Sequence, residues 1–375
     1  MNTSEYVNNI IEDIRKRGID ALKFYSEKFD KYSGDFKVNE DEFDEAERLI
    51  PYEDIKVIEK TYERIYDNHK KQIYPDIFSF KNSSMYGIIY KPIKRIGEYI
   101  PGSKPLPSTV MMITAPAKIA GVGEIVLTSA PVQNKLNPYV LYIAKFLGIS
   151  EVYKIGGIQA IAAMAYGIGM KNVDKIFGPG NIYVNEAKRQ VYGIVGIDGL
   201  YGPSEICVLA DSDANPEYIL SDLRSQLEHG ETSKSWIVTT NKKTGEYVND
   251  RKIEVKIFES MEQCIDCVND LAPEHLEIMV KEPMGVVEKI ENAGAIYIGD
   301  YTPVPSCDYF TGVNHLLPTG RTAKFSSALT VTDFMKKTSF AYNSREDFME
   351  NRYLGMRLAE IENMNFHKQS MEVRK

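Results

Sequence analysis

The sequence predicts an α/β protein made of two incomplete Rossmann-like, doubly wound domains, with small helical extensions at the N- and C-termini. Two observations support this fold class. Short β-rich runs alternate with helical patterns both before and after Gly202-Pro203-Ser204, which is typical of βαβ units around a parallel sheet. The length of 375 residues, with 43% hydrophobic content, is enough for two modest cores or one large one.

The first 75 residues are predicted to be helical, because apolar residues recur at three- and four-residue spacing. The expected helices are Glu5 to Phe29, Glu40 to Leu49 and Tyr52 to Gln72. His69 lies in a polar stretch at the end of the last of these, so we expect it to be a solvated helix residue without a local role.

The first alternating series extends from residue 84 to residue 191. We expect its strands at Tyr86–Ile93, Glu124–Thr128, Val152–Ile155 and Lys175–Phe177, and its helices at Thr109–Ala120, Pro138–Leu147, Gln159–Tyr166 and Asn181–Val191.

The second series follows Gly202. Its expected strands are Ile206–Ala210, Trp236–Thr239, His275–Val280 and Ala295–Ile298, and its expected helices are Pro216–His229, Met261–Leu271 and Val286–Asn292. Prolines and glycines between Pro303 and Gly320 predict irregular loop, and the tail from Tyr342 to Met364 is predicted to be helical.

Composition excludes several classes of function. A net charge of −8 with interleaved acids and bases argues against a nucleic-acid surface. No apolar stretch reaches the roughly 20 residues that span a bilayer, and the N-terminus lacks the apolar core of a signal peptide. Four cysteines in a chain of this length do not make a disulfide framework. Cys264 and Cys267 are expected to be buried on the apolar face of a helix. We therefore expect a cytoplasmic protein.

Four of the five histidines lie close to acids or amides, which points to an active site because histidine titrates near neutral pH and is the commonest metal ligand. Gln226 and His229 are three residues apart at the end of a helix, so both project from one face. A shared ligand or metal is geometrically natural there, although a solvated helix end is the alternative. Glu274 and His275 are adjacent where a strand begins, an arrangement that suits proton transfer.

Two strand-to-helix junctions are rich in glycine: Gly156-Gly157 before Gln159, and Gly178-Pro179-Gly180-Asn181. Their backbone N–H groups could receive the phosphates of a dinucleotide. Neither junction has the G-x-G-x-x-G spacing, so close-packed turns explain them equally well.

Taken together, these segments resemble the histidinol dehydrogenase family over nearly the whole chain, and most weakly in the first 80 residues. The motifs that carry the resemblance are Arg95-Ile96-Gly97-Glu98-Tyr99-Ile100-Pro101-Gly102, Pro105-Leu106-Pro107-Ser108-Thr109, Gly178-Pro179-Gly180-Asn181, Glu186-Ala187-Lys188-Arg189, Gly202-Pro203-Ser204-Glu205, Ser225-Gln226-Leu227-Glu228-His229, Leu271-Ala272-Pro273-Glu274-His275-Leu276, Thr311-Gly312-Val313-Asn314-His315-Leu316-Leu317-Pro318-Thr319, and the tail around His367.

The resemblance implies a zinc ion bound by Gln226, His229, Asp308 and His367, with His367 supplied by the partner subunit of an intertwined homodimer. Glutamine is an unusual zinc ligand, and Glu228 fits the usual ligand types better. Helical spacing nevertheless favours Gln226, because it shares a face with His229 and Glu228 does not.

The resemblance also implies the reaction, which is oxidation of L-histidinol to L-histidine with two NAD+ in succession. The family's catalytic pair falls on Glu274 and His275, and these two residues and the four zinc ligands also contact the substrate. The further implied substrate contacts are Ser204, His315 and Glu362, and the implied NAD contacts are Tyr99, Gln159 and Asn181.

The chain departs from the family pattern at a shorter N-terminal region and at the turn Gly102-Ser103-Lys104-Pro105. Three alternative functions are a zinc- and NAD-dependent dehydrogenase of another polar alcohol, a zinc hydrolase, and a non-catalytic metal- or nucleotide-binding protein. The expected division is an N-terminal extension (1–25), a discontinuous substrate and zinc domain (26–98 and 205–330), an NAD-binding domain (99–204), and a tail (331–375) that contributes to the partner's site.

Overall fold

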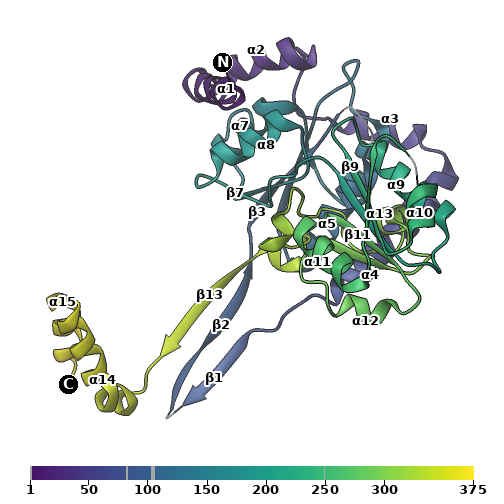
Figure 1. Cartoon of the computed structure of the whole chain (residues 1–375). Helices are drawn as coiled ribbons and strands as arrows, with labels where there is room; N and C mark the ends of the chain where they lie inside the picture. Colours follow the sequence, from purple (N-terminus) through teal and green to yellow (C-terminus); the bar gives the residue numbers. More distant parts are fainter. Residues whose placement is uncertain (1, 82, 103–105, 249) are drawn as a thin grey trace. The chain divides into compact units, whose positions relative to one another are not determined.

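The computed structural model describes residues 2–81, 83–102, 106–248 and 250–375 (Figure 1). The chain forms two compact units. Unit 1 comprises Met1–Gln72 and Ile93–Phe334, and unit 2 comprises Ile73–Pro92 and Met335–Lys375. The division of unit 1 into a substrate domain and a cofactor domain stays a prediction.

Unit 1 contains two five-stranded sheets in which every strand pairing is parallel. The first has the order β5-β4-β3-β6-β7 and the second has the order β10-β9-β8-β11-β12. Each order is 3-2-1-4-5 in terms of appearance along the chain, which is five-sixths of the doubly wound arrangement. The predicted fold class is therefore confirmed.

The first sheet is built from β3 (Arg95–Ile100), β4 (Glu124–Ser129), β5 (Glu151–Lys154), β6 (Lys175–Phe177) and β7 (Gly196–Ile197). Its connecting helices are α5 (Pro107–Ala120), α6 (Pro138–Phe146), α7 (Gly157–Tyr166) and α8 (Ile182–Val191). Every residue of β3 is buried, as expected for the central strand of a sheet that is covered on both faces.

The second sheet consists of β8 (Glu205–Ala210), β9 (Lys234–Thr239), β10 (Ile253–Ile257), β11 (His275–Met279) and β12 (Ala295–Ile298). Its helices are α9 (Pro216–Leu227), α10 (Lys242–Tyr247), α11 (Met261–Leu271), α12 (Pro283–Val287) and α13 (Val304–Tyr309), followed by the 3-10 turns Thr322–Lys324 and Val331–Phe334. Cys264 is fully buried against β8 and β9 residues, and Cys267 packs beside it, so their expected packing role is confirmed.

Four helices precede the sheets: α1 (Thr3–Arg17), α2 (Ile19–Asp30), α3 (Glu40–Leu49) and α4 (Tyr52–Lys70). The predicted single helix from Glu5 to Phe29 is wrong, because Gly18 adopts φ +60° and divides it into α1 and α2. Helix α1 packs on α7 and α8 through Val7, Ile10, Ile11 and Ile14 (Figure 1).

Several predicted boundaries need correction. The strands β1, β3, β7, β10 and β13 were not predicted, and the stretch expected to be irregular after Pro303 contains α13. The helix expected at Val286–Asn292 is mostly wrong, because α12 begins at Pro283, a favourable first helical residue, and already ends at Val287. Shortness explains the misses of β7 and α13, because elements of two to six residues carry too few positions to show a period.

Unit 2 is an antiparallel sheet with the order β1-β2-β13, followed by two helices. Its elements are β1 (Ile77–Lys81), β2 (Ser84–Pro92), β13 (Met335–Tyr342), α14 (Arg345–Ile361) and α15 (Asn365–Glu372). The Ser84 hydroxyl donates to Asp347 at 2.8 Å and ties the sheet to α14. The helix expected from Tyr342 to Met364 is largely confirmed as α14, but it begins at Arg345 and ends at Ile361, because Tyr342 ends strand β13. In the part of the chain described by the structure, no helix is long and apolar enough to cross a membrane.

Candidate active site

The predicted acid–base pair lies at the start of β11, which is between β8 and β12 in the second sheet. Glu274 is buried, and its Oε2 accepts a hydrogen bond of 2.9 Å from the Glu205 backbone N–H at the start of β8. Its Oε1 lies 3.7 Å from His275 Nε2. Burial raises the pKa of Glu274 well above its ordinary value. The two groups are therefore held side by side in a site of low polarity.

A hydrogen bond at the second ring nitrogen of His275, Nδ1, orients its imidazole. Its Nδ1 lies 2.8 Å from the hydroxyl of Tyr297 on β12, and the two rings stack with centroids 5.7 Å apart. Burial is the main reason that the pKa of His275 is lowered to about 3, and the nearby His315 and His229 contribute to this shift. The imidazole is therefore neutral near pH 7. When Nδ1 carries the proton and donates to Tyr297, Nε2 is a proton acceptor that faces Glu274.

His315 and Asp308 form a second polar pair close to the first. His315 Nδ1 lies 3.8 Å from Asp308 Oδ1, and His315 Nε2 lies 3.3 Å from the Thr109 hydroxyl of α5. Burial raises the pKa of Asp308 to about 7 and lowers that of His315 to about 4. Asp308 also contributes to the raised pKa of Glu274. The Thr109–His315 contact thus joins α5, next to the first sheet, to the loop that carries His315.

Gln226 and His229 lie at the C-terminal end of α9. Gln226 is buried, whereas His229 is exposed and its backbone N–H donates to the Gln226 carbonyl at 3.2 Å. The charge of a protonated His229 would lower the pKa of both His275 and His315, so His229 lies within electrostatic range of both. The structure therefore brings His229, Asp308, Glu274, His275 and His315 into one neighbourhood.

Ser204 is placed directly before β8, and its carbonyl accepts a hydrogen bond of 2.9 Å from Lys234 N. The two remaining predicted substrate residues belong to unit 2. Glu362 follows α14, His367 lies on α15, and both are exposed. Their assignment to the site stays a prediction.

The predicted zinc ligands are of types that can bind zinc, but unit 1 contains only three of the four. Among the described residues, no three His, Cys, Asp or Glu side chains are grouped closely enough to hold a metal ion. Unit 1 supplies one amide, one imidazole and one carboxylate from the predicted set. The raised pKa of Asp308 has burial as its cause, so a bound cation would relieve a cost that the fold leaves in place.

The three predicted NAD contacts line one cavity of about 490 Å³ in the first sheet's half of unit 1. Tyr99 is near the end of β3, Gln159 is in the first turn of α7, and Asn181 caps α8 by accepting hydrogen bonds from Tyr183 N and Val184 N. The remaining lining residues are Tyr6, Phe29, Asp30, Pro101, Gly102, Ala130, Gly157, Ile158 and Tyr183.

The glycine-rich junctions around this cavity are rigid. A Cβ at Gly156 would collide with Ala130, and a Cβ at Gly178, where φ is +116°, would collide with the Tyr99 carbonyl. The Gly178 carbonyl and N–H are both held, the first by Lys188 Nζ at 2.9 Å and the second by Asp198 Oδ2 at 2.7 Å. Lys188 and Asp198 are completely buried and paired at 2.5 Å. The loop before Asn181 is thus clamped from inside the protein.

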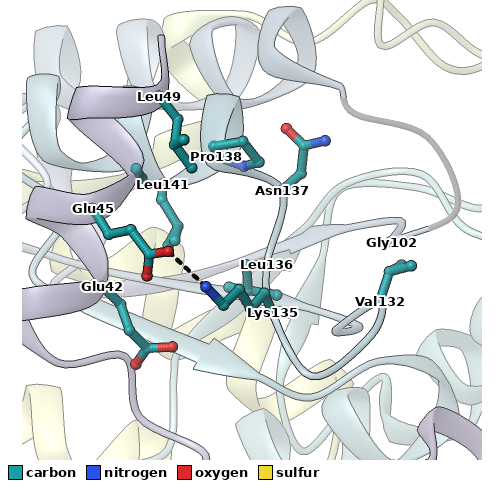
Figure 2. Close-up of a pocket in the computed structure, with 11 residues that line it drawn as sticks. Glu42, Glu45, Leu49, Gly102, Val132, Lys135, Leu136, Asn137, Pro138 and Leu141 are labelled. Carbon is teal, nitrogen blue, oxygen red and sulfur yellow. Dashed lines mark hydrogen bonds and ion pairs between the residues drawn. The ribbon is translucent and has the colours of Figure 1, made fainter.

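A second cavity, of about 320 Å³, shares the lining residue Gly102 with the first. Figure 2 shows its walls, which come from α3 and from the loop that leads into α6. Lys135 and Glu45 face each other across it at 2.6 Å. The altered turn noted in the sequence falls mostly at residues 103–105, which lie outside the described residues.

Comparison with known proteins identifies the family. The family model described as histidinol dehydrogenase matches residues 1–256 and 250–375. The histidinol dehydrogenase of Thermococcus kodakarensis is 59% identical over 371 residues, which cover 99% of each chain. The chain belongs to the histidinol dehydrogenase family.

A histidinol dehydrogenase from Methanocaldococcus jannaschii is 40% identical over 392 residues, covering 98% of this chain and 91% of its own. The crystal structure of histidinol dehydrogenase from Elizabethkingia anophelis superposes with a TM-score of 0.95 at 34% identity, covering 100% of this chain and 92% of that one. Betaine aldehyde dehydrogenase from Staphylococcus aureus shares the fold alone, with a TM-score of 0.53 at 13% identity over 91% of this chain and 82% of that one. The expectations of family membership and of an oxidoreductase are confirmed.

Sequence reasoning missed several residues of this histidinol dehydrogenase family site. Tyr297 and Thr109 contact the two histidines but lie in an ordinary strand and helix. His69 is the clearest error, because it is fully buried rather than solvated. Its Nδ1 donates to the Ile65 carbonyl at 2.7 Å, which leaves Nε2 to accept from Asn314 Nδ2 at 3.1 Å. His69 therefore supports the residue that precedes His315.

Proposed function

We propose that this protein oxidises L-histidinol through L-histidinal to L-histidine, using zinc and two NAD+ in succession. Members of the family to which it belongs catalyse this last step of histidine biosynthesis. The observation that carries the proposal is the buried His275, which is held through Nδ1 by Tyr297 while Nε2 faces Glu274. A neutral imidazole in this setting is suited to accept the proton of an alcohol.

Zinc would be held by Gln226, His229 and Asp308 together with His367 of the partner subunit. When bound, it supplies a fixed positive charge that orients the imidazole and amino groups of the substrate. The helix dipole of α9 favours a cation at this point, because Gln226 and His229 lie at its C-terminal end.

In the first oxidation, hydride leaves the alcohol carbon for the nicotinamide ring and the hydroxyl proton passes to His275 Nε2. The products are histidinal, NADH and a protonated His275. Glu274 Oε1 lies 3.7 Å from Nε2, so the ionised form of Glu274 stabilises the imidazolium. The proton must then leave His275 before it can act again.

In the second oxidation, water first adds to the aldehyde, because a carbonyl carbon without a hydroxyl cannot readily lose a hydride. Glu274 accepts one proton of this water, and the aldehyde oxygen takes the proton that His275 gained in the first oxidation, so a hydrate with two hydroxyl groups forms and His275 is neutral again. The raised pKa of Glu274 makes its carboxylate a stronger base than an exposed one. Hydride then leaves the hydrate for a second NAD+, and His275 takes the hydroxyl proton. The product is the carboxylic acid.

The proposal includes a homodimer with shared sites. Unit 2 exposes large apolar side chains on its sheet and helices, and such surfaces mark protein interfaces. They include Phe78, Phe80, Tyr342, Leu354, Leu358, Ile361 and Phe366. Exposed Glu362 and His367 on this unit would be delivered to the partner's site. A cytoplasmic location remains a prediction.

The decisive experiment measures NADH formed per L-histidinol consumed to exhaustion by the zinc-loaded protein. We expect a ratio of two. A ratio of one would mean that the protein is an alcohol dehydrogenase that carries out only the first oxidation. Absence of NADH would favour a dehydrogenase of another polar alcohol or a zinc hydrolase. Controls without zinc and without protein measure the background.

The division of labour between the two catalytic residues has its own test. Glu274→Gln should slow oxidation of added histidinal far more than oxidation of histidinol, because only the second step needs activated water. Stopped-flow measurement of each step separately decides this. Equal losses in both steps would overturn the assignment.

A further inference from the structure

The cofactor cavity contains an acidic side chain that neither the motifs nor the family resemblance assigns. Asp30 is the last residue of α2 and lines the cavity with Tyr99, Gln159 and Asn181. Among the described residues that line this cavity, it is the only one with a carboxyl or basic side chain. Its position beside a proposed dinucleotide site calls for an explanation, because NAD+ carries a negatively charged diphosphate.

Asp30 is bound to the protein through one oxygen. Its Oδ2 accepts hydrogen bonds from Gly156 N at 3.1 Å and from Gln159 Nε2 at 3.0 Å. Burial raises the pKa of Asp30, and the two donated hydrogen bonds oppose that shift. Both neighbours are hydrogen-bond donors, and a carboxylate requires donors because it can only accept hydrogen bonds.

The bond to Gln159 determines which end of that amide is available. Gln159 is fully buried, and its NH2 group is turned toward Asp30. Its Oε1 has no hydrogen-bond partner among the described residues. A buried carbonyl oxygen without a partner is costly unless a ligand supplies a donor. The Asp30 contact therefore leaves the oxygen of Gln159, and not its NH2 group, without a partner in a residue that lines the cavity.

Two backbone N–H groups at the N-terminus of α7 already have hydrogen-bond partners in the protein. Gly156 N–H donates to Asp30, and Gly157 N–H donates to the Tyr99 hydroxyl at 3.2 Å. In the common dinucleotide fold, N–H groups at this kind of junction receive the diphosphate. Here a carboxylate takes that place, which gives a physical reason for the absence of the usual glycine fingerprint.

Resting on the proposed NAD-dependent function, we infer that Asp30 is a positioning and specificity residue: it orients Gln159 to accept a hydrogen bond from a donor of NAD+, and it disfavours a phosphorylated cofactor. The donor is a ribose hydroxyl or the carboxamide NH2 of the nicotinamide. The 2′-phosphate of NADP+ replaces a hydroxyl donor with an anion, so it would lose a hydrogen bond and meet the charge of Asp30.

The test uses the full-length, zinc-loaded protein and steady-state kinetics with NAD+, NADP+ and 3-acetylpyridine adenine dinucleotide, which lacks the carboxamide NH2. Asp30→Ala frees the Gln159 amide, so KM for NAD+ should rise roughly tenfold with little change in kcat. Asp30→Asn keeps an acceptor in place but removes the charge. It should retain a KM for NAD+ near that of the wild type and lower the ratio of KM for NADP+ to KM for NAD+ severalfold.

The pattern of discrimination identifies the donor. If Gln159 accepts from the carboxamide, Asp30→Ala loses the wild type's discrimination against the acetylpyridine analogue. If it accepts from the adenosine ribose, the variant loses discrimination against NADP+ instead. Glu27→Gln, which removes an exposed acid from the same helix, is the matched control and should change neither.

Unchanged KM values and cofactor preference in both Asp30 variants would overturn the inference. So would a loss of kcat and thermal stability in Asp30→Asn without a shift in cofactor preference, because that would mean a purely structural role. Failure of the proposed function is recognised separately: the wild type would then show no NAD+ binding by isothermal titration calorimetry and no NADH formation.

Discussion

The two sheets of unit 1 have the same strand order but use opposite edges. In the first sheet, Tyr99, Gly157 and Asn181 are at or beyond the carboxyl ends of strands, where α7 and α8 begin. In the second sheet, Glu274 and His275 stand at the amino end of β11, beside Glu205 at the amino end of β8. One topology therefore supports two kinds of site.

Helix dipoles give a physical reason for this difference. The carboxyl edge of a parallel sheet faces helix N-termini, which carry partial positive charge and suit a dinucleotide, whereas the amino edge faces helix C-termini, which suit cations. Gln226 and His229 end α9 at that second edge. Mutations at the amino edge should therefore change the chemistry, and mutations at the carboxyl edge should change cofactor affinity.

The largest effect is expected at the amino edge. His275→Asn removes the proposed base and should lower kcat for both oxidations by about 10³-fold, within the range for loss of acid–base catalysis. The dissociation constant for NAD+, measured by calorimetry, should stay within twofold of the wild type. A comparable weakening of NAD+ binding would break the separation between the edges.

Tyr297→Phe should have a smaller effect at the same edge. It removes the 2.8 Å hydrogen bond to His275 Nδ1 and keeps the ring. Loss of about one hydrogen bond should lower kcat roughly tenfold. Steady-state kinetics should show KM for NAD+ unchanged, and a variant with wild-type kcat would show that Tyr297 does not orient the base.

Tyr99→Phe tests the carboxyl edge. The variant loses the hydrogen bond from Gly157 N–H to the Tyr99 hydroxyl, so the start of α7 is held less firmly. KM for NAD+ should rise by roughly fivefold, because the net contribution of such a bond is about 1 kcal/mol. Single-turnover measurement at saturating NAD+ should give an unchanged rate, and a slower chemical step would contradict the prediction.

The smallest effect on catalysis is expected at Glu98, which is fully buried on β3 and accepts a hydrogen bond of 2.8 Å from Thr114. Burial raises its pKa from 4.5 to about 8, so the folded protein retains a proton between these pH values that the unfolded chain releases. Its contribution should therefore lower the free energy of unfolding by roughly 1.4 kcal/mol per pH unit as pH rises through that window.

Glu98→Gln should remove this slope while leaving kcat unchanged. Urea unfolding of both proteins at pH 5, 6, 7 and 8 gives the difference, so that other titrating groups cancel. Parallel curves for the two proteins would mean that the Glu98 carboxyl titrates at the same pH in the folded and unfolded states.

The candidate site was only partly predictable from the sequence. The adjacency of Glu274 and His275 could be seen directly. The prediction that Gln226 and His229 share a helix face stays a prediction, because α9 ends at Leu227 and His229 lies in the turn that follows it. The neutral state of His275 could not be predicted, because it depends on burial and on Tyr297. His69 was assigned to solvent because its immediate neighbours are polar, yet it bonds to Asn314, which lies 245 residues away.

The sequence by itself determined the alternation of strands and helices and the family, and it led to the proposed acid–base residues. These are properties of local periodicity and of motifs, which each segment carries without its neighbours. Only the tertiary structure decided that one sheet uses its carboxyl edge and the other its amino edge, and that Asp30 turns the amide of Gln159. These depend on packing between residues far apart in the chain, because burial and hydrogen-bond partners exist only once the segments have come together.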